Sequence, residues 1–386
     1  MTHITIGSVR NTTFALLMAT GVSVGAPGTA LADPLLEEVV EFAGTILYLE
    51  HKVPGLVIGA VRNGETATYG IGEASDGGEA PDGDTVLRIG SITKAFTGQV
   101  LAQLAADGTV SLTQKLGELA PDLGSGADAN VANIRLIDIA THSAGLPREL
   151  PHEHGPANDP FATITRVGFS KWLKTEQLLF APGTGILYSN FAFDLLSIAL
   201  SEAADQPYPK LLEEHITEPL GMKDTTFVLT NEQKGRLMQG HNFDGKPLPD
   251  VPTGSVIVGS GGLYSTPKDL LRWMEWHLDR LSTDGAETRM LDHAAYLVRD
   301  GLNPVSGMDE SGRMDAMGLG WVVMMPEGNR PLILQKAGGL QGTFSYIAFA
   351  PTRGIAIFIS INEFSFGAAM AMGEAANEMI ATLAPR

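Results

Sequence analysis

The sequence contains no cysteine among its 386 residues. Disulfide bonds, thiol catalysis and cysteine-based metal sites are therefore excluded. A chain of this length does not need such cross-links, because 44% of its residues are hydrophobic and can bury a sizeable core. These features favour one large domain or two closely packed ones.

Positive charge is also scarce. The chain carries 26 Lys and Arg against 44 Asp and Glu, so its formal net charge is -18. Such an excess of negative charge repels phosphate backbones and anionic lipid headgroups. We therefore expect no nucleic-acid partner and no docking to an anionic membrane surface.

Long hydrophobic runs are missing after residue 32, which predicts no transmembrane span. Within residues 1–32, Arg10 is the only full charge, the apolar run 14–24 is too short to cross a bilayer, and Ala30-Leu31-Ala32 has the small-x-small form of a signal-peptidase site. We interpret this segment as a cleaved signal peptide rather than a disordered cytosolic leader. The mature chain is then expected in the periplasm or the medium.

The order of predicted elements indicates an α/β (α+β) fold in which an antiparallel sheet is flanked by helices. Helical spacing of apolar residues predicts a first helix over 34–51, and Asn63-Gly64 between two apolar runs predicts a β-hairpin. Shorter helices are expected over 134–141, 173–179, 190–204 and 208–220, strands over 318–324, 331–335, 343–350 and 354–361, and a last helix over 368–383. We therefore predict an α/β part, 33–111 and 256–386, interrupted by a mostly helical insert, 112–255.

Ser91 and Lys94 lie three residues apart at the start of an apolar-periodic segment, so they share one face of a predicted helix. A serine hydroxyl is a poor nucleophile without a neighbouring base. A buried lysine near the positive end of a helix dipole can lose its proton and serve as that base. The pair is a candidate nucleophile and base that needs no histidine.

The same Ser-x-x-Lys pattern recurs at Ser265 and Lys268. Here Pro267 stands where a helix begins, Thr266 can cap it, and Asp269 falls in the first turn. We interpret this copy as the start of a helix with a solvated lysine.

Two later motifs can supply partners for Ser91. Tyr188 and Asn190 stand at a loop-to-helix junction, where a phenol can relay a proton and an amide can fix a carbonyl, although a structural tyrosine and a helix cap remain open alternatives. Lys336-Ala337-Gly338 ends an apolar strand and runs into Gly339. A cation there suits an extended substrate lying along a strand edge, and an ordinary edge lysine is the alternative.

In this order and spacing, Ser-x-x-Lys, Tyr-x-Asn and Lys-x-Gly resemble the motifs of the serine penicillin-recognising enzymes, in the branch of class C β-lactamases and low-molecular-weight penicillin-binding proteins. The resemblance spans 35–384 and includes the stretches 140–151, 188–196, 219–227 and 259–267. It implies a β-lactamase/transpeptidase-like fold.

The resemblance also implies a role for each motif residue. Ser91 is the acylated nucleophile, Lys94 its base and Tyr188 a proton shuttle, while the backbone N–H groups of Ser91 and Gly339 form an oxyanion hole. The substrate-binding residues are Asn190, Lys336, Gly338 and Glu149. Glu149 stands where class C β-lactamases place a glutamine, and Ala337 replaces the usual threonine or serine, which puts carboxylate recognition in question.

The function implied is that of an exported serine D,D-peptidase, a D-alanyl-D-alanine carboxypeptidase and endopeptidase, with peptidoglycan peptides and β-lactams as ligands and no cofactor. A β-lactamase or an esterase using the same site is the alternative, and a catalytically silent penicillin-binding sensor is a third. The intact motif set disfavours the sensor, and Lys336 favours carboxylate-bearing substrates over plain esters. The rate at which water clears the acyl-enzyme, and the oligomeric state, stay open.

His152-Glu153-His154 is the one sequence that suggests a metal. It lies in a loop rich in Pro, Gly and Asn, without an obvious third ligand. We expect solvated loop residues and no metal site.

Cleavage after Ala32 is testable by intact-mass measurement of protein recovered from the periplasmic or secreted fraction. The mature chain should begin at Asp33 and carry a net charge of -19, because Arg10 is lost. A cytoplasmic protein that keeps the apolar run 14–24 would contradict the signal-peptide interpretation.

Overall fold

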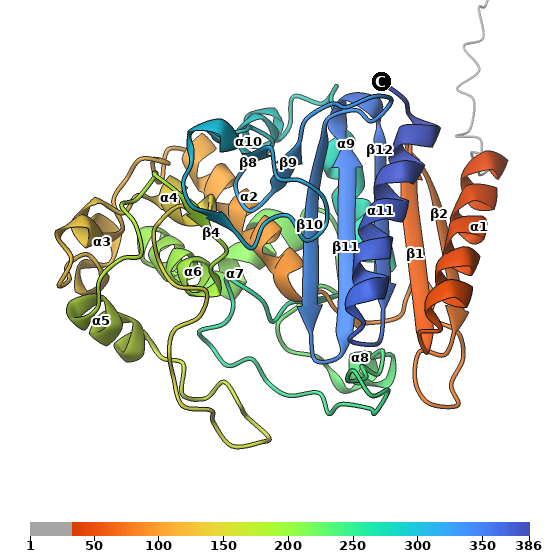
Figure 1. Cartoon of the computed structure of the whole chain (residues 1–386), viewed down its shortest axis with the longest axis horizontal. Helices are drawn as coiled ribbons and strands as arrows, with labels where there is room; N and C mark the ends of the chain where they lie inside the picture. Colours follow the sequence, from red (N-terminus) through yellow and green to blue (C-terminus); the bar gives the residue numbers. More distant parts are fainter. Residues whose placement is uncertain (1–32) are drawn as a thin grey trace, which may run out of the picture. The chain divides into compact units, whose positions relative to one another are not determined.

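The computed structural model describes residues 33–386, and an eight-stranded antiparallel sheet forms its centre (Figure 1). The predicted signal peptide and its cleavage site lie outside the described residues. The strand order is β2-β1-β12-β11-β10-β9-β8-β6. The strands are β1 (Gly55–Arg62), β2 (Glu65–Gly72), β6 (Leu297–Val298), β8 (Ala316–Met317), β9 (Val322–Met324), β10 (Ile333–Leu340), β11 (Thr343–Ala350) and β12 (Ile355–Ile361).

The predicted hairpin is confirmed as β1 and β2, which pair up to Arg62 and Glu65. Asn63 and Gly64 between them both have positive φ, 53° and 84°. Two left-handed residues in succession match a type I′ turn, whose twist suits two antiparallel strands. The Asn-Gly pair therefore sets the register of this edge of the sheet.

Helices cover both faces of the sheet. On one face α1 (Pro34–His51) and α11 (Phe366–Leu383) pack together, and α11 lies across β11 and β12 (Figure 1). On the other face α9 (Pro267–Leu278) packs against β1 and β12. Ile357 and Ile359 of β12 face the core under α1 and α11, while Phe358 faces the core on the other side of the sheet. Both faces of this strand are therefore buried, and Ser360 is its only polar residue.

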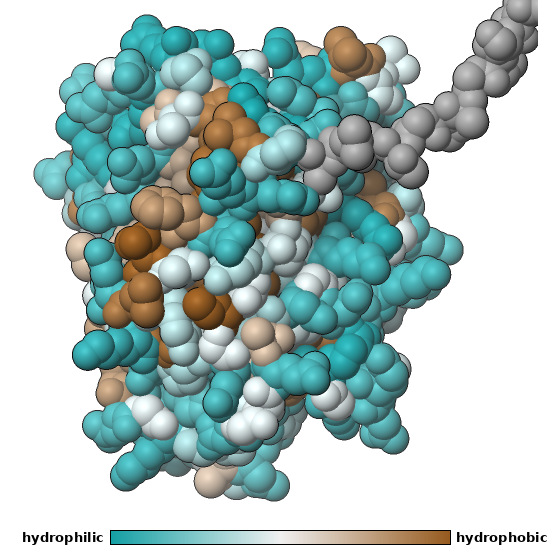
Figure 2. Space-filling model, turned by 90° about the vertical axis from the view of Figure 1, so that its right-hand side faces the viewer, coloured by the Kyte–Doolittle hydropathy of each residue, from teal (hydrophilic) through white to brown (hydrophobic). Residues whose placement is uncertain are grey.

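The surface on the α1 side is mostly hydrophilic, with scattered hydrophobic patches (Figure 2). Helix α1 buries Leu36, Val40 and Leu47 against the sheet. Its opposite face exposes four large apolar side chains, Leu35, Phe42, Ile46 and Leu49. The apolar pattern of this helix is thus broader than its contact with the sheet.

Helix α2 (Thr93–Ala106) lies between the central sheet and the helices α6, α7 and α10. Every residue from Thr93 to Ala102 is buried, because α6, α7 and α10 pack around it. A helix enclosed in this way has no solvated face for charged side chains, which explains the lack of charge after Lys94. The other helices are α3 (Leu116–Leu119), α4 (Leu136–Ala140), α5 (Arg166–Thr175), α6 (Asn190–Ala204), α7 (Tyr208–Leu212), α8 (Asn231–Gly235) and α10 (Ala286–Asp292). We keep the division into an α/β part and the insert 112–255 as a proposal.

Helix α5 departs from the expected 173–179. It starts earlier because the Thr165 hydroxyl caps it by accepting the Gly168 N–H, and it ends at Thr175 because Glu176 is extended. Among residues 33–386, no helix is both long and apolar enough to cross a membrane.

Strand β10 lies directly against the 3-10 turn η1 (Gly90–Ile92), and two glycines make this approach possible. Gly90 has φ of 51°, and a Cβ on it would lie 2.7 Å from the Gly339 nitrogen. A Cβ on Gly338 would lie 2.1 Å from the Ile89 carbonyl oxygen and 2.9 Å from the Ser91 nitrogen. Both clashes are with backbone, which cannot rotate away.

Gly338→Ala should therefore lower the free energy of unfolding by about 3 kcal/mol, the upper end of the cost of overpacking. Urea denaturation measures this change. Gly235→Ala is the control, because a Cβ on this helical glycine meets nothing within 4 Å. Equal unfolding midpoints for the two variants would contradict the close contact between β10 and η1.

Candidate active site

Ser91 lies in η1, just before α2, and Lys94 lies in the first turn of α2. Gly90 turns the chain through its left-handed conformation, which brings Ser91 to the floor of a cleft. The Ser91 side chain is half-buried, whereas Lys94 is fully buried. The two residues thus share one turn but meet very different surroundings.

Three oxygen atoms surround the Lys94 amine. Its Nζ lies 3.1 Å from Ser91 Oγ, 2.5 Å from Asn190 Oδ1 and 2.5 Å from the Ser260 carbonyl oxygen. A neutral amine has two N–H bonds and one lone pair. The amide and carbonyl oxygens can only accept, so they take the two N–H groups and leave the lone pair for the Ser91 hydroxyl. This arrangement suits a base that removes the serine proton.

Burial is the main cause that lowers the pKa of Lys94 to about 7. Asp194 and Glu149 oppose this shift, and Arg148 adds to it. Asp194 lies on α6 one turn after Asn190, and its carboxylate accepts the Ser260 N–H at 3.0 Å. Burial raises the pKa of Asp194 to about 7. A change of pH near neutrality therefore alters the charge of both groups, and the charge of each one favours the charged form of the other.

Tyr188 contacts Ser91 from the other side, with its hydroxyl 2.5 Å from Ser91 Oγ. Two cationic groups face its ring, Lys336 Nζ at 4.9 Å from the centroid and the Arg148 guanidinium carbon at 4.6 Å. Lys94 Nζ also lies 4.9 Å from the centroid and becomes cationic once it takes a proton. Positive charge at this range stabilises negative charge that develops on the phenol oxygen. Tyr188 is thereby suited to accept a proton and pass it on.

His142 packs against the ring of Tyr188. Its ring stacks on Tyr188 with centroids 4.7 Å apart, and its Nδ1 accepts the Ser189 N–H at 3.1 Å. Burial lowers the pKa of His142 well below its usual value, and Lys336 and Lys94 add to this effect. The ring is therefore neutral and positions Tyr188 without adding charge.

Strand β10 forms the other wall of the cleft. The prediction that it ends at Gly338 is wrong, since the strand runs to Leu340 through its pairing with β11. Its partner β9 pairs only with Ile333, Leu334 and Gln335, so within residues 33–386 the edge from Lys336 onward has no strand beside it. Lys336 is buried, and desolvation lowers its pKa to about 8. Gly339 borders the same cleft as Ser91. An oxyanion hole formed by the backbone N–H groups of these two residues remains a proposal.

Two hollows meet at Ser91, and both also border Arg148 and Gly339. The larger, about 570 Å³, contains Tyr188, Lys336 and Ala337 beside apolar side chains, Met308, Phe344 and Met370. The other, about 390 Å³, contains Glu149 and Asn190, whose side chains are hydrogen-bonded to each other. A substrate spanning Ser91 thus meets cations on one side and a carboxylate with an amide on the other.

The structure brings together every predicted site residue, and it adds four that the motifs did not single out, namely His142, Arg148, Asp194 and Ser260. Asp194 had a detectable signal, because it is the one acid in the apolar run 191–200 and stands four residues after Asn190. Arg148 and Ser260 come from loops, where no periodic pattern predicts contact. The Ser260 contribution is a backbone carbonyl, to which side-chain identity gives no clue.

The second Ser-x-x-Lys copy lies elsewhere, as predicted. Thr266 caps α9 by accepting the Asp269 N–H, Ser265 Oγ contacts Thr225 Oγ1 at 2.8 Å, and Lys268 is exposed beside Asp84. His152 and His154 border the smaller hollow, and they belong to no group of three potential metal ligands within residues 33–386.

Comparison with known proteins gives concordant matches. Residues 29–378 match a family model described as Beta-lactamase. The chain is 37% identical over 363 residues to the D-alanyl-D-alanine-carboxypeptidase/endopeptidase AmpH of Escherichia coli K12, covering 91% of this chain and 92% of that protein. It is 24% identical to a β-lactamase of Pseudomonas fluorescens, covering 85% and 94%.

Solved structures agree. A β-lactamase/D-alanine carboxypeptidase from Yersinia pestis, complexed with citrate, superposes with a TM-score of 0.80 at 35% identity, covering 90% of this chain and 98% of that one. A class C β-lactamase superposes with a TM-score of 0.76 at 18% identity, covering 92% and 98%. The second likeness shows the fold alone.

The acylation rate of Ser91 should depend on pH through Lys94 and Lys336. Below pH 7 Lys94 is protonated and cannot act as a base, so the rate should rise roughly tenfold per pH unit up to its pKa. Above about pH 8 Lys336 loses its charge, so a carboxylate-bearing acylating agent should react less well. Stopped-flow acylation by a fluorescent penicillin measures the whole profile.

Asp194→Asn should move the rising limb of this profile to lower pH, because the Asp194 charge raises the pKa of Lys94. The amide keeps the acceptor for the Ser260 N–H. Asp269→Asn controls for the loss of a buried carboxylate that borders neither hollow. A limb that stays in place, or that moves to higher pH, would show that Lys94 is not the titrating base.

Proposed function

The chain belongs to the beta-lactamase family, and on that premise we propose that it is an exported serine D,D-peptidase, a D-alanyl-D-alanine carboxypeptidase and endopeptidase that acts on peptidoglycan peptides through an acyl-enzyme on Ser91. One observation carries the proposal. Ser91 Oγ lies between Lys94 Nζ at 3.1 Å and Tyr188 Oη at 2.5 Å, so one group can take its proton while the other delivers a proton to the leaving group.

In the acylation step, Ser91 Oγ attacks the carbonyl carbon of the scissile D-alanyl amide while its proton passes to Lys94 Nζ. The backbone N–H groups of Ser91 and Gly339 stabilise the oxyanion. The C–N bond then breaks, and the leaving amine takes a proton from Tyr188, which recovers one from Lys94. An ester on Ser91 and a free D-alanine, or the amine of a cross-linked peptide, are the products.

Water completes the cycle. Its oxygen attacks the ester carbonyl while Tyr188 takes the water proton and passes its own to Lys94. The C–O bond to Ser91 then breaks, and Lys94 returns this proton through Tyr188. Ser91 Oγ takes back a proton and the shortened peptide leaves with a new carboxylate. No cofactor enters either step, because the side chains supply each proton transfer.

The two hollows support a substrate with a terminal carboxylate. Lys336 and Arg148 supply positive charge on the side of the leaving group, where a D-alanine carboxylate would lie. Asn190 lies on the acyl side, where its amide can bind the peptide carbonyl. Glu149 adds a negative charge there and suits acyl groups that carry a free amine.

Hydrolysis of β-lactams is the second candidate, because the beta-lactamase family model covers 29–378 and a β-lactam acylates the same serine. Glu149 weighs against it, since class C β-lactamases place a glutamine at this position. We therefore expect β-lactams to acylate Ser91 and to be released slowly. Plain esters are less suited to the site, since they lack the carboxylate that Lys336 and Arg148 would bind.

Export is part of the proposal. The signal-peptide pattern in residues 1–32 and a cell-wall substrate both place the mature protein in the periplasm or outside the cell. A peptidase held in the cytoplasm would not meet cross-linked peptidoglycan.

A labelling and turnover experiment tests the function. The wild type should bind fluorescent penicillin covalently and release D-alanine from a muropeptide that ends in D-alanyl-D-alanine. Ser91→Ala should abolish both activities, Lys94→Ala should nearly abolish them, and Tyr188→Phe should lower kcat more than it raises KM. Ser265→Ala is the matched control, because it removes the serine of the second Ser-x-x-Lys copy and should leave both activities intact.

Labelling that survives in Ser91→Ala would overturn the assignment, and rapid turnover of a chromogenic β-lactam without D-alanine release would favour the β-lactamase.

Ala337→Thr tests the carboxylate subsite. Ala337 borders the larger hollow beside Lys336, and a hydroxyl at this position can donate a hydrogen bond to a substrate carboxylate. Such a bond to a charged group should raise acylation by carboxylated substrates by about tenfold, the low end of its usual worth, since Lys336 already supplies charge. An ester without a carboxylate should gain little. An equal response of both substrate types would show that Ala337 lies outside the carboxylate subsite.

A further inference from the structure

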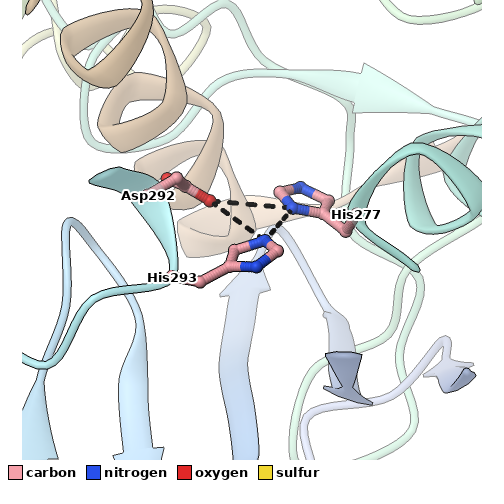
Figure 3. A group of neighbouring side chains, drawn as sticks. All are labelled: His277, Asp292 and His293. Atoms are coloured by element: carbon pink, nitrogen blue, oxygen red, sulfur yellow. Dashed lines mark hydrogen bonds and ion pairs between the residues drawn. The ribbon is translucent and has the colours of Figure 1, made fainter. Parts of the chain in front are cut away.

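A second cluster of titratable side chains lies outside the cleft. His277 stands in the last turn of α9, and Asp292 and His293 stand at the end of α10. The three side chains point toward one another (Figure 3). His277 and Asp292 are fully buried, and the His293 side chain is 15% exposed. Within residues 33–386, no other three potential metal ligands lie so close together.

The three nearest ligand atoms form a compact triangle. His277 Nδ1 lies 2.8 Å from His293 Nε2 and 3.6 Å from Asp292 Oδ2, and His293 Nε2 lies 3.9 Å from Asp292 Oδ2. In the plane of these three atoms, the point equidistant from them lies about 2.0 Å from each. This distance is the length of zinc–nitrogen and zinc–oxygen bonds. Only the His–His distance fits a hydrogen bond, because the two distances to Asp292 are too long.

We propose that His277, Asp292 and His293 bind a divalent transition-metal cation, and that Zn²⁺ suits this set of two imidazoles and one carboxylate best. The remaining position falls to water or to Asp292 Oδ1. That oxygen is buried and has no hydrogen-bond partner among residues 33–386.

The surroundings favour a cation. The carboxyl of Asp292 has one hydrogen bond, accepted by Oδ2 from the Trp321 indole N–H at 2.9 Å. Metal binding takes the deprotonated carboxylate and the neutral imidazoles, so it releases any proton that these side chains hold. A bound cation compensates the buried carboxylate, and the Trp321 hydrogen bond holds it in orientation.

Among residues 33–386, Arg289 places positive charge near both histidines and opposes the cation. Its guanidinium donates to the carbonyl oxygens of Ser282 and Asp284 and lies over the Trp276 ring, 5.0 Å from the centroid. These contacts hold its charge at a fixed place. It therefore weakens the affinity without occupying the site.

The role of the ion is structural. The His277 ring lies 4.8 Å from the Trp273 ring, which stacks on Phe96 of α2 at 3.7 Å. The cation would thus join α9 to α10 beneath the helix that carries Lys94. His293, the only partly exposed ligand, gives it a route of entry.

Metal binding by the purified full-length mature chain tests the proposal. The protein is stripped with a chelator, dialysed against zinc chloride and then against metal-free buffer, and its zinc content is measured by mass spectrometry. We expect about one zinc per chain and a melting temperature raised by roughly 3–5 °C at a hundredfold excess of zinc over Kd. Cobalt(II) in place of zinc should give the intense visible absorption of a tetrahedral site.

His293→Gln should lose the zinc and the cobalt absorption, and it should fold because this ring is partly exposed. Asp292→Asn should also lose them while it keeps an acceptor for Trp321. The double variant His152→Gln/His154→Gln is the control, because it removes two loop histidines and should keep the metal.

Less than about 0.1 zinc per chain in the wild type, with no shift of the melting temperature, would overturn the proposal. Zinc retained by His293→Gln but lost by the loop variant would overturn it as well. If both ligand variants fail to fold, the cobalt spectrum of the wild type decides, since a spectrum without tetrahedral bands excludes the site. None of these readouts depends on peptidase activity.

Discussion

The rest of the site depends on the burial of the Lys94 amine. Lys94 loses almost all contact with water, and desolvation brings its pKa down to about 7. Everything around it maintains that condition. Helix α2 is enclosed on all sides, Asn190 and Ser260 take the two N–H groups of the amine, and Asp194 lies buried beside it as a compensating group. The lone pair of the amine is left to face Ser91.

The same constraint explains the glycines at the cleft. For a substrate to lie beside Ser91, strand β10 must come within backbone contact of η1, and only Gly90 and Gly338 allow this. Within residues 33–386, the edge of β10 from Lys336 onward has no strand on its β9 side and gives an extended surface next to Ser91. Packing that keeps water from the lysine therefore also builds the groove for the substrate.

Much of this was predictable from local patterns. The Asn63-Gly64 turn, helix α1 and the apolar strands follow from propensity and periodicity, and the three spaced motifs pointed to the family that the comparisons confirm. Helix α5 was misplaced because its start depends on a single cap, Thr165. The end of β10 was misplaced because glycines that usually interrupt a strand here continue one. Ser260 emerged only from tertiary structure, as did the pair His277 and His293. These two histidines are separated along the chain and are joined by the packing of α9 and α10.

The ionisation of Lys94 in the resting protein is the most direct test of this account. Lysine labelled with ¹³C at Cε reports the titration of each amine by NMR, and comparison with Lys94→Arg assigns the signal. The account predicts that Lys94 titrates near pH 7, far below the exposed lysines. A Lys94 signal that titrates together with the exposed lysines, at about pH 10, would contradict it.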